Sequence, residues 1–152
     1  MKAWKRIDPS SIDKVGWRTV THKTFVAPDG STYPADTFDA DGTRCAAIIA
    51  LTPERKVVIA RQFRCGPEAI MDEIPGGYVD KGEDPEAAAI RELQEETGYT
   101  VGAITYLGKV YKHAWMNTEW HFYLATDCLP SKQGQSLEPT EYVEVDLISI
   151  ST

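Results

Sequence analysis

The chain has few cysteines and no hydrophobic run long enough to cross a membrane. Its three cysteines, among 152 residues, are odd in number and scattered, which argues against a disulfide framework and predicts free thiols in a reducing cytosol. A transmembrane helix needs about 20 apolar residues, and the first nine residues contain no apolar core typical of a signal peptide. We therefore expect a single-domain cytoplasmic protein with no membrane partner.

Positive charge is also scarce. The chain has 16 Lys and Arg against 23 Asp and Glu, a formal net charge of −7, which disfavours non-specific binding of nucleic acid or acidic membranes. An anionic substrate would then need local positive charge. Arg61 and Arg64, at the end of a predicted strand, are the candidates.

Alternating and continuous apolar segments predict a strand-rich chain with one confident helix. A turn at 27–31 separates the first two predicted strands into an N-terminal antiparallel hairpin, and the segment 65–77 has no regular pattern. Four large aromatic residues are most simply core or interface residues: Trp4, Trp17, Tyr111 and Trp120. The predicted strands are 14–26, 32–38, 45–51, 57–63, 101–111, 120–125 and 142–148.

The helix is predicted over 85–97 by its end signals. Asp84 is a good N-cap, Pro85 a natural first helical residue, and Gly98 a natural stop. Ile90, Leu93 and Thr97 would pack on the sheet. The sheet needs cover on its second face, and two sources remain open: a helix beyond residue 152 or a partner subunit.

Three glutamates, Glu92, Glu95 and Glu96, fall on a helical face roughly 100° wide. They repel one another, and two lie in the last turn, where the helix dipole disfavours negative charge. A sequence that breaks two local rules is compensated elsewhere. Carboxylate oxygens at high charge density suit Mg²⁺, with Mn²⁺ as a substitute. The alternative, a solvated acidic helix, leaves the fixed positions around it unexplained.

Those fixed positions form one pattern: Gly77, five residues, Glu83, seven residues, then Arg91-Glu-Leu-Gln-Glu-Glu-Thr-Gly98. The stretch 77–99 resembles the Nudix box, and the chain is similar to the Nudix hydrolases. The resemblance implies an α+β fold, an α/β/α sandwich around a mixed β-sheet, in one domain over 1–152. It also implies that N-terminal strands within 1–42 form a homodimer.

Roles for the box residues follow from the resemblance. Glu92, Glu95 and Glu96 would hold the divalent ions, with the main-chain carbonyl of Gly76 as a further ligand. Glu83 and Arg91 would join the loop to the helix, and for Arg91 structural and catalytic roles both remain open.

The general base is open as well. Glu92 is one candidate. Glu138 and Glu141, just before the last predicted strand, are others, with ordinary solvated loop acids as the alternative for both.

The resemblance extends upstream to 57–64 and 72–77, which are similar to the branch that cleaves ADP-ribose and nucleoside diphosphate sugars. It implies that Arg64 contacts a substrate phosphate or ribose, since a guanidinium matches phosphate oxygens. Arg61 is equally a surface strand residue, and Glu73 is expected to pair with an arginine.

The chain departs from that branch after the box. Where those enzymes carry Ser-Pro-Gly followed by a glutamate, this chain has 113–119, which retains Glu119 and lacks the proline and glycine. Trp115 would stack on a base, and His113 is a weaker candidate. An NDP-sugar and ADP-ribose both remain candidate substrates.

The reaction that such a site favours is Mg²⁺-dependent hydrolysis of a phosphoanhydride. The products would be a nucleoside monophosphate and a phosphorylated second product. The alternative is a non-catalytic Nudix domain that binds a nucleotide and regulates a partner. Such proteins usually have a degraded box, and here every fixed position is present.

Overall fold

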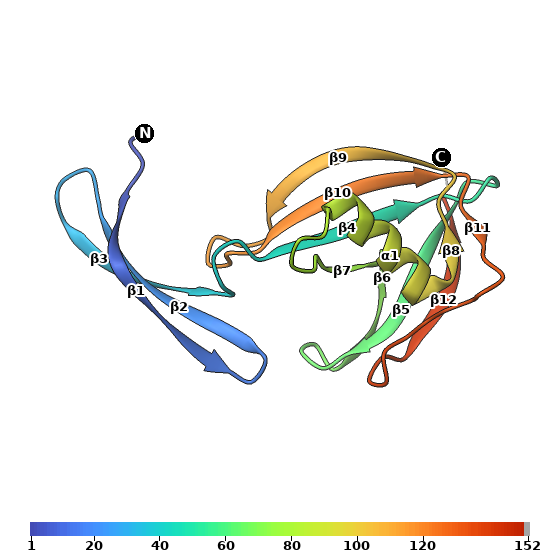
Figure 1. Ribbon diagram of the computed structural model, residues 1–152, viewed down its shortest axis with the longest axis horizontal. Coiled ribbons are helices and arrows are strands. Elements are labelled where there is room, and N and C mark those ends of the chain that lie inside the picture. Colours follow the sequence, from blue (N-terminus) through green and yellow to red (C-terminus); the bar gives the residue numbers. More distant parts are fainter. Residues whose placement is uncertain (151–152) are drawn as a thin grey trace. The chain divides into compact units, whose positions relative to one another are not determined.

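The computed structural model describes residues 1–150, except for the side chains of Asp8 and Pro9. The chain divides into two compact units (Figure 1). The first consists of residues 1–43 together with 110–119, and the second of residues 44–109 together with the chain from 120 onward.

The first unit contains a three-stranded antiparallel sheet, β1 (Lys5–Val15), β2 (Arg18–Val26) and β3 (Thr32–Phe38), in that order. The prediction of one strand over 14–26 is wrong, because Gly16, with a φ of 63°, turns the chain between β1 and β2. The register of β1 shifts between Ile7 and Ser11, an irregularity that conceals the alternation of a strand. The predicted turn at 27–31 is confirmed by the bond that the Gly30 N–H donates to Ala27 O at 3.0 Å.

Two polar clusters hold this sheet. His22 on β2 lies between carboxylates of both neighbouring strands, with Nδ1 2.8 Å from Asp36 and Nε2 3.1 Å from Asp13. On the buried side, the ammonium of Lys23 is 2.8 Å from a carboxylate oxygen of Asp41 and donates to Asn117 Oδ1 at 2.7 Å. The second cluster attaches segment 110–119 to the N-terminal sheet.

The second unit is built on a mixed sheet in the order β7 (Gly76–Tyr78), β4 (Arg44–Ala50), β10 (Glu119–Thr126) and β9 (Ala103–Tyr111). β7 is antiparallel to β4, whereas the arrows of β4 and β10 point the same way and that of β9 the opposite way (Figure 1). The predicted strands at 45–51, 101–111 and 120–125 correspond to β4, β9 and β10, with ends that differ by one or two residues.

A second, antiparallel sheet has the order β12 (Val143–Ser149), β5 (Lys56–Arg64) and β6 (Ala69–Glu73). The short strands β8 (Tyr99–Thr100) and β11 (Leu129–Pro130) pair with each other. The expectation that 65–77 is irregular is wrong, because β6 and the start of β7 lie in it. β6 is short and largely exposed, and β7 has three residues, of which two are glycines, so their sequences lack the apolar periodicity that predicts a strand.

The helix α1 (Pro85–Thr97) has the predicted ends and packs against β4 and β7. The buried face of α1 is formed chiefly by Ala88, Ala89 and Leu93. Alanines of β4 also belong to this core. Ile90 is 37% exposed, so its predicted packing on the sheet is wrong, whereas Leu93 and Thr97 are buried. The core residues are Ala46, Ile48, Ala50, Val58, Ala88, Ala89, Leu93, Tyr123, Ala125 and Cys128.

The aromatic residues assigned to the core or an interface are not in the core. Trp4, Trp17 and Tyr111 are at least half exposed, Trp17 by 74%, and Trp120 is half-buried. Within residues 1–150, no helix has the length and apolar character to span a membrane.

Candidate metal and phosphoanhydride site

The loop and helix of the box are fixed by their caps. The side chain of Asp84 accepts a bond from the Glu86 N–H at 2.9 Å, which satisfies a free donor of the first helical turn. Gly98 closes α1 in the left-handed conformation, with a φ of 73°, and its N–H donates to Gln94 O. This cap places the glutamates of the last turn in a defined register.

The last carbonyls of α1 are satisfied by the segment after β11. The Ser136 N–H donates to Glu95 O at 2.9 Å, and Gln135 Nε2 donates to Glu96 O at 2.6 Å and to Val143 O at 3.0 Å. Gln135 therefore joins the end of the helix to β12. Sequence reasoning missed this residue because a glutamine in an irregular loop carries no pattern.

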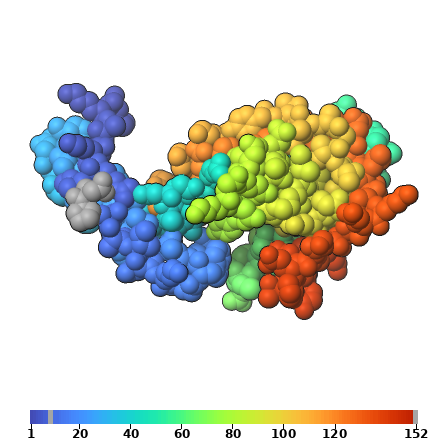
Figure 2. Space-filling model, in the orientation of Figure 1, coloured from blue at the N-terminus to red at the C-terminus, as the bar shows by residue number. Residues whose placement is uncertain are grey.

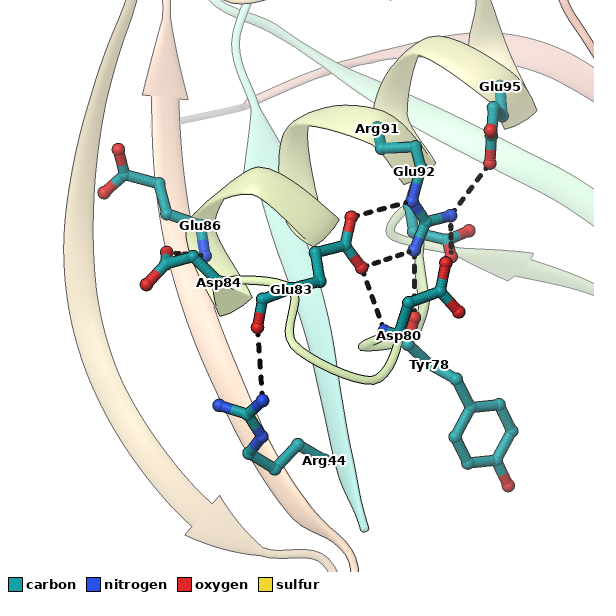
Figure 3. Close-up of polar contacts among 9 residues, drawn as sticks. All are labelled: Arg44, Tyr78, Asp80, Glu83, Asp84, Glu86, Arg91, Glu92 and Glu95. Carbon is teal, nitrogen blue, oxygen red and sulfur yellow. Dashed lines mark hydrogen bonds and ion pairs between the residues drawn. The ribbon is translucent and has the colours of Figure 1, made fainter.

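Arg91 is the centre of the site (Figure 3). Its Nε and Nη2 donate to the two carboxylate oxygens of Glu83 at 3.0 and 3.1 Å, and Nη2 also donates to Tyr78 O at 3.0 Å. Its Nη1 donates to Glu92 Oε1 at 2.8 Å and to Glu95 Oε2 at 2.9 Å. The bonds from Arg91 lower the pKa of Glu83 below its usual value. The structure therefore contains the predicted junction of loop and helix.

Glu83 also organises the loop itself. Its Oε2 accepts a bond from the Asp80 N–H at 2.9 Å, and its backbone oxygen accepts one from Arg44 Nη2 at 3.1 Å. The loop 78–84 is thus tied both to the helix and to β4 (Figure 3). The role of Arg44 in holding Glu83 lies outside the box pattern and was not predicted.

Glu96 is the buried carboxylate of the site, and Glu92 is half-buried. Glu96 is 6% exposed, and the Glu92 side chain 14%. Burial, the main cause, raises the pKa of Glu96 to about 7, although the Gly76 N–H, 3.0 Å from its Oε2, acts in the opposite direction. Burial also raises the pKa of Glu92. Glu96 lies beside the buried Leu93 and Thr97, so the three glutamates do not share one exposed face.

Negative charge from a distant loop reaches this pair. The charge of Glu141 raises the pKa of both Glu92 and Glu96, so the fold couples carboxylates that lie 49 and 45 positions apart in the chain. The Glu138 N–H donates to Glu141 Oε2 at 2.9 Å, and Glu138 itself is exposed. Of the two loop acids predicted as bases, Glu141 is the one whose charge acts on the buried glutamates.

The two arginines of β5 are both in ion pairs. Arg64 holds Glu73 through Nε and Nη2, the expected pairing of Glu73, and its charge lowers the pKa of Glu96. Arg61 donates to Asp72 at 2.6 Å and is 3.0 Å from Asp146, on the two neighbouring strands. The charge of Arg64 therefore influences the buried Glu96, whereas Arg61 joins β5 to β6 and β12.

The substrate residues predicted after the box belong to the first unit. The rings of His113 and Trp115 are stacked, with centroids 5.3 Å apart, and Trp115 O accepts the Phe38 N–H at 2.8 Å. The Glu119 N–H donates to Thr43 O at 3.0 Å. The roles of Trp115 and Glu119 stay predictions.

The donor set fits a hard divalent cation. The charge of Glu92 raises the pKa of the buried Glu96, so the site carries negative charge that a cation would compensate, and carboxylate oxygens are the ligands that Mg²⁺ prefers. A Cβ on Gly77 would lie 2.5 Å from Glu92 Oε1, so a larger residue there would push this carboxylate out of its place. In the part of the chain that the structure describes, no three acidic, His or Cys side chains form a ready metal-binding group. Arg91 lies between Glu92 and Glu95.

The box geometry agrees with comparisons to known proteins. The profile of the NUDIX domain matches residues 42–151. The chain belongs to the Nudix family. Its fold is also that of a solved structure, "Crystal structure of ADP compounds hydrolase". That structure matches with a TM-score of 0.73 at 20% identity over 93% of this chain and 78% of the other. The predicted fold class, a Nudix α/β/α sandwich around a mixed sheet, is confirmed.

Relatives place this Nudix chain near ADP-ribose enzymes. It is 39% identical to the ADP-ribose pyrophosphatase of Bacillus subtilis over 100 residues, 65% of this chain and 54% of that protein. It is 34% identical to the methanol dehydrogenase activator of Bacillus methanolicus over 125 residues, 82% of this chain and 65% of that protein. The chain thus spans between half and two thirds of the length of these relatives. Nudix hydrolases generally use a divalent metal.

Proposed function

We propose that this Nudix chain is a Mg²⁺-dependent pyrophosphohydrolase, with Mn²⁺ as a possible substitute metal. Its proposed substrate is a nucleoside diphosphate linked to a second moiety, an NDP-sugar or ADP-ribose. The products would be a nucleoside monophosphate and a phosphorylated compound. The observation that carries the proposal is the buried Glu96 beside the half-buried Glu92, two carboxylates whose pKa values burial and the charge of Glu141 raise.

Each residue of the site has a proposed task. Glu92, Glu95 and Glu96, with the carbonyl of Gly76, would hold the cation. A divalent cation supplies charge withdrawal from phosphorus and a more acidic bound water. Glu83 and Arg91 keep the loop against the helix, so that the carboxylates are in place before substrate arrives.

Outside the box, the proposed tasks are proton transfer and substrate binding. Glu141, whose charge acts on the buried glutamates, is better placed than Glu138 to accept a proton from the attacking water. Arg64 would leave Glu73 in part to contact a phosphate, since its guanidinium offers further donors. Glu119 is proposed to contact the substrate on the strength of the family resemblance. Trp115 is proposed because its ring can stack on a base, and Arg61 because an anionic substrate needs positive charge nearby.

The proposal is tested with a panel of NDP-sugars, ADP-ribose, dinucleotides and nucleoside triphosphates, in Mg²⁺ and in EDTA. We expect turnover of at least one diphosphate in Mg²⁺ only, with products resolved in ¹⁸O-water to identify the phosphorus attacked. Glu96→Gln should lower kcat by a factor of at least about 10². The matched control is Glu86→Gln, an exposed glutamate of the same helix, which should keep full activity. No turnover of any compound would refute the proposal.

A second candidate function is regulation of a partner enzyme by a nucleotide-binding Nudix domain. The observation that favours it is the likeness to the methanol dehydrogenase activator, which covers 82% of this chain. The same panel separates the two functions. A regulator would bind a nucleotide in calorimetry without turning it over, and Glu96→Gln would then leave nucleotide-dependent activation of a partner in place.

Homodimerisation and a cytoplasmic location are also proposed. The N-terminal sheet exposes apolar side chains, Ile12 and Val15 among them, which supports its use as a dimer surface as the family resemblance implies. The free thiols Cys45, Cys65 and Cys128 fit a reducing compartment. Light scattering of the full chain, compared with an Ile12→Lys variant, tests the dimer. A monomeric wild-type protein would refute it.

A further inference from the structure

One guanidinium faces in two directions at the centre of the site. Arg91 turns Nε and Nη2 toward the loop, where they hold Glu83 and the Tyr78 carbonyl. It turns Nη1 alone toward the helix, where this one nitrogen contacts both Glu92 and Glu95 (Figure 3). The loop contacts and the helix contacts therefore use different atoms of the same side chain.

The positively charged Nη1 group of Arg91 lies between the carboxylates of Glu92 and Glu95. A half-buried carboxylate such as Glu92, with 14% of its side chain exposed, is costly unless it is paired. Arg91 and Glu95 are four residues apart on the helix, which keeps them within reach. The oxygens that accept bonds from Nη1 belong to two of the three glutamates that the proposed function assigns to the divalent cation. A guanidinium and a divalent cation repel each other and cannot both use these oxygens fully.

We propose that Nη1 of Arg91 and the divalent cation compete for the carboxylates of Glu92 and Glu95. When the cation binds, Nη1 leaves at least one of them, while Nε and Nη2 keep their bonds to Glu83 and Tyr78 O. Arg91 thus stabilises the protein in the absence of metal and weakens metal binding. This inference rests on the proposed function, in that it requires the site to bind a metal.

Competition and a purely structural role for Arg91 predict opposite changes in metal affinity when Arg91 is replaced. If Arg91 only orders the loop and the glutamates, its removal disorders the ligands and weakens metal binding. If Nη1 competes, its removal frees two carboxylates and strengthens metal binding. In both cases the protein in EDTA loses stability, because Glu83, Glu92 and Glu95 lose a shared partner. The change in metal affinity therefore decides between them.

The test is calorimetric titration of the full chain with Mn²⁺ and Mg²⁺, without substrate. We expect Arg91→Gln to bind the cation about tenfold more tightly than the wild type, within the range of typical coupling between two ligands. Arg91→Lys, which keeps the charge and has a single nitrogen to share, should show a smaller gain. The control Lys81→Gln removes one positive charge from the exposed loop of the box and should change the affinity less than about twofold, since solvent screens it.

A second readout follows the atoms directly. In ¹⁵N spectra of the arginine side chains, Mg²⁺ should shift the Nη1 signal of Arg91 and leave the Nε signal, which reports the Glu83 bond, close to its position. If Arg91→Gln does not fold in EDTA, Arg91→Lys and these spectra still decide the outcome.

Each result has one meaning. Equal or weaker metal binding by a folded Arg91→Lys or Arg91→Gln protein, or an Nη1 signal that metal leaves unchanged, would overturn the competition while the proposed function stands. If the wild type binds neither Mn²⁺ nor Mg²⁺, the proposed metal-dependent function fails, and the competition fails with it.

Discussion

Replacing Glu96 with glutamine tests how much the buried negative charge of Glu96 destabilises the folded protein. The pKa of Glu96 lies at about 7 in the folded protein, against a usual value of 4.5. Between these two values the folded protein binds more protons than the unfolded chain, so its stability falls as the pH rises from 4.5 to 7. Above pH 7 the full cost of the buried charge is present, and the gap between the two pKa values corresponds to about 3 kcal/mol.

Glutamine resembles the protonated acid and has no charge to bury. Its amide oxygen still accepts the Gly76 N–H, while its amide nitrogen needs an acceptor in a buried place, which offsets about 1 kcal/mol. In EDTA at pH 8 we therefore expect Glu96→Gln to be about 2 kcal/mol more stable than the wild type, or about 4–8 °C higher in melting temperature. At pH 5 the gain should disappear, because Glu96 is then protonated.

Urea denaturation in EDTA at pH 5 and pH 8 measures this difference. Glu86→Gln, an exposed change in the first turn of α1, should lower stability by a few tenths of a kcal/mol at both pH values, because negative charge there favours the helix dipole. If Glu96→Gln is instead less stable than the wild type by several kcal/mol at pH 8, the Glu96 carboxylate is part of a stabilising ion pair, and the reasoning about its buried charge is wrong.

Three further predictions concern other parts of the molecule. His22, whose pKa is raised by the carboxylates beside it, Asp36 first, should stabilise the N-terminal sheet below pH 6.5 and cease to do so as the pH rises through its raised pKa. Protection factors from amide exchange of β1–β3 at pH 6 and 8, which correct for the faster intrinsic exchange at pH 8, would show this, and those of His22→Gln should be alike at both. Gly76→Ala, whose Cβ would collide with the backbone of β4, should cost about 1–3 kcal/mol in urea unfolding, and a neutral result would contradict the close packing. Leu93→Ala should cost about 2–5 kcal/mol and Ile90→Ala clearly less, because Leu93 is buried and Ile90 is 37% exposed; equal losses would contradict this order.

The outer surface of the box remains accessible in the second unit. In Figure 2 the lime-green and yellow atoms of the box loop and α1 form part of the visible surface. A hollow of about 590 Å³ adjoins the outer side of the helix, lined by Ile90, Arg91 and Tyr99 among others. The exposed Ile90 therefore borders this hollow and does not contribute to the core.

Where local chemistry decides structure, the sequence was sufficient. Asp84, Pro85 and Gly98 determine the ends of α1, because capping depends on residues a few positions apart. The continuous apolar runs of β4 and β5 predict buried strands for the same reason. The spacing of the box identified the family, since a pattern of fixed charges and glycines along one loop and one helix is independent of the rest of the chain.

Where the chain must meet itself over long distances, only the tertiary structure decided. The packing of α1 against the sheet buries Glu96 and leaves Ile90 exposed, although helical periodicity places Glu96 with the polar residues. The fold of the last loop brings the charge of Glu141 to Glu92 and Glu96. The pairing of β6 with β5 makes a strand of a segment that has no periodicity. Burial and long-range electrostatic effects depend on residues that are distant in the sequence and close in the fold, and a local sequence pattern does not identify those residues.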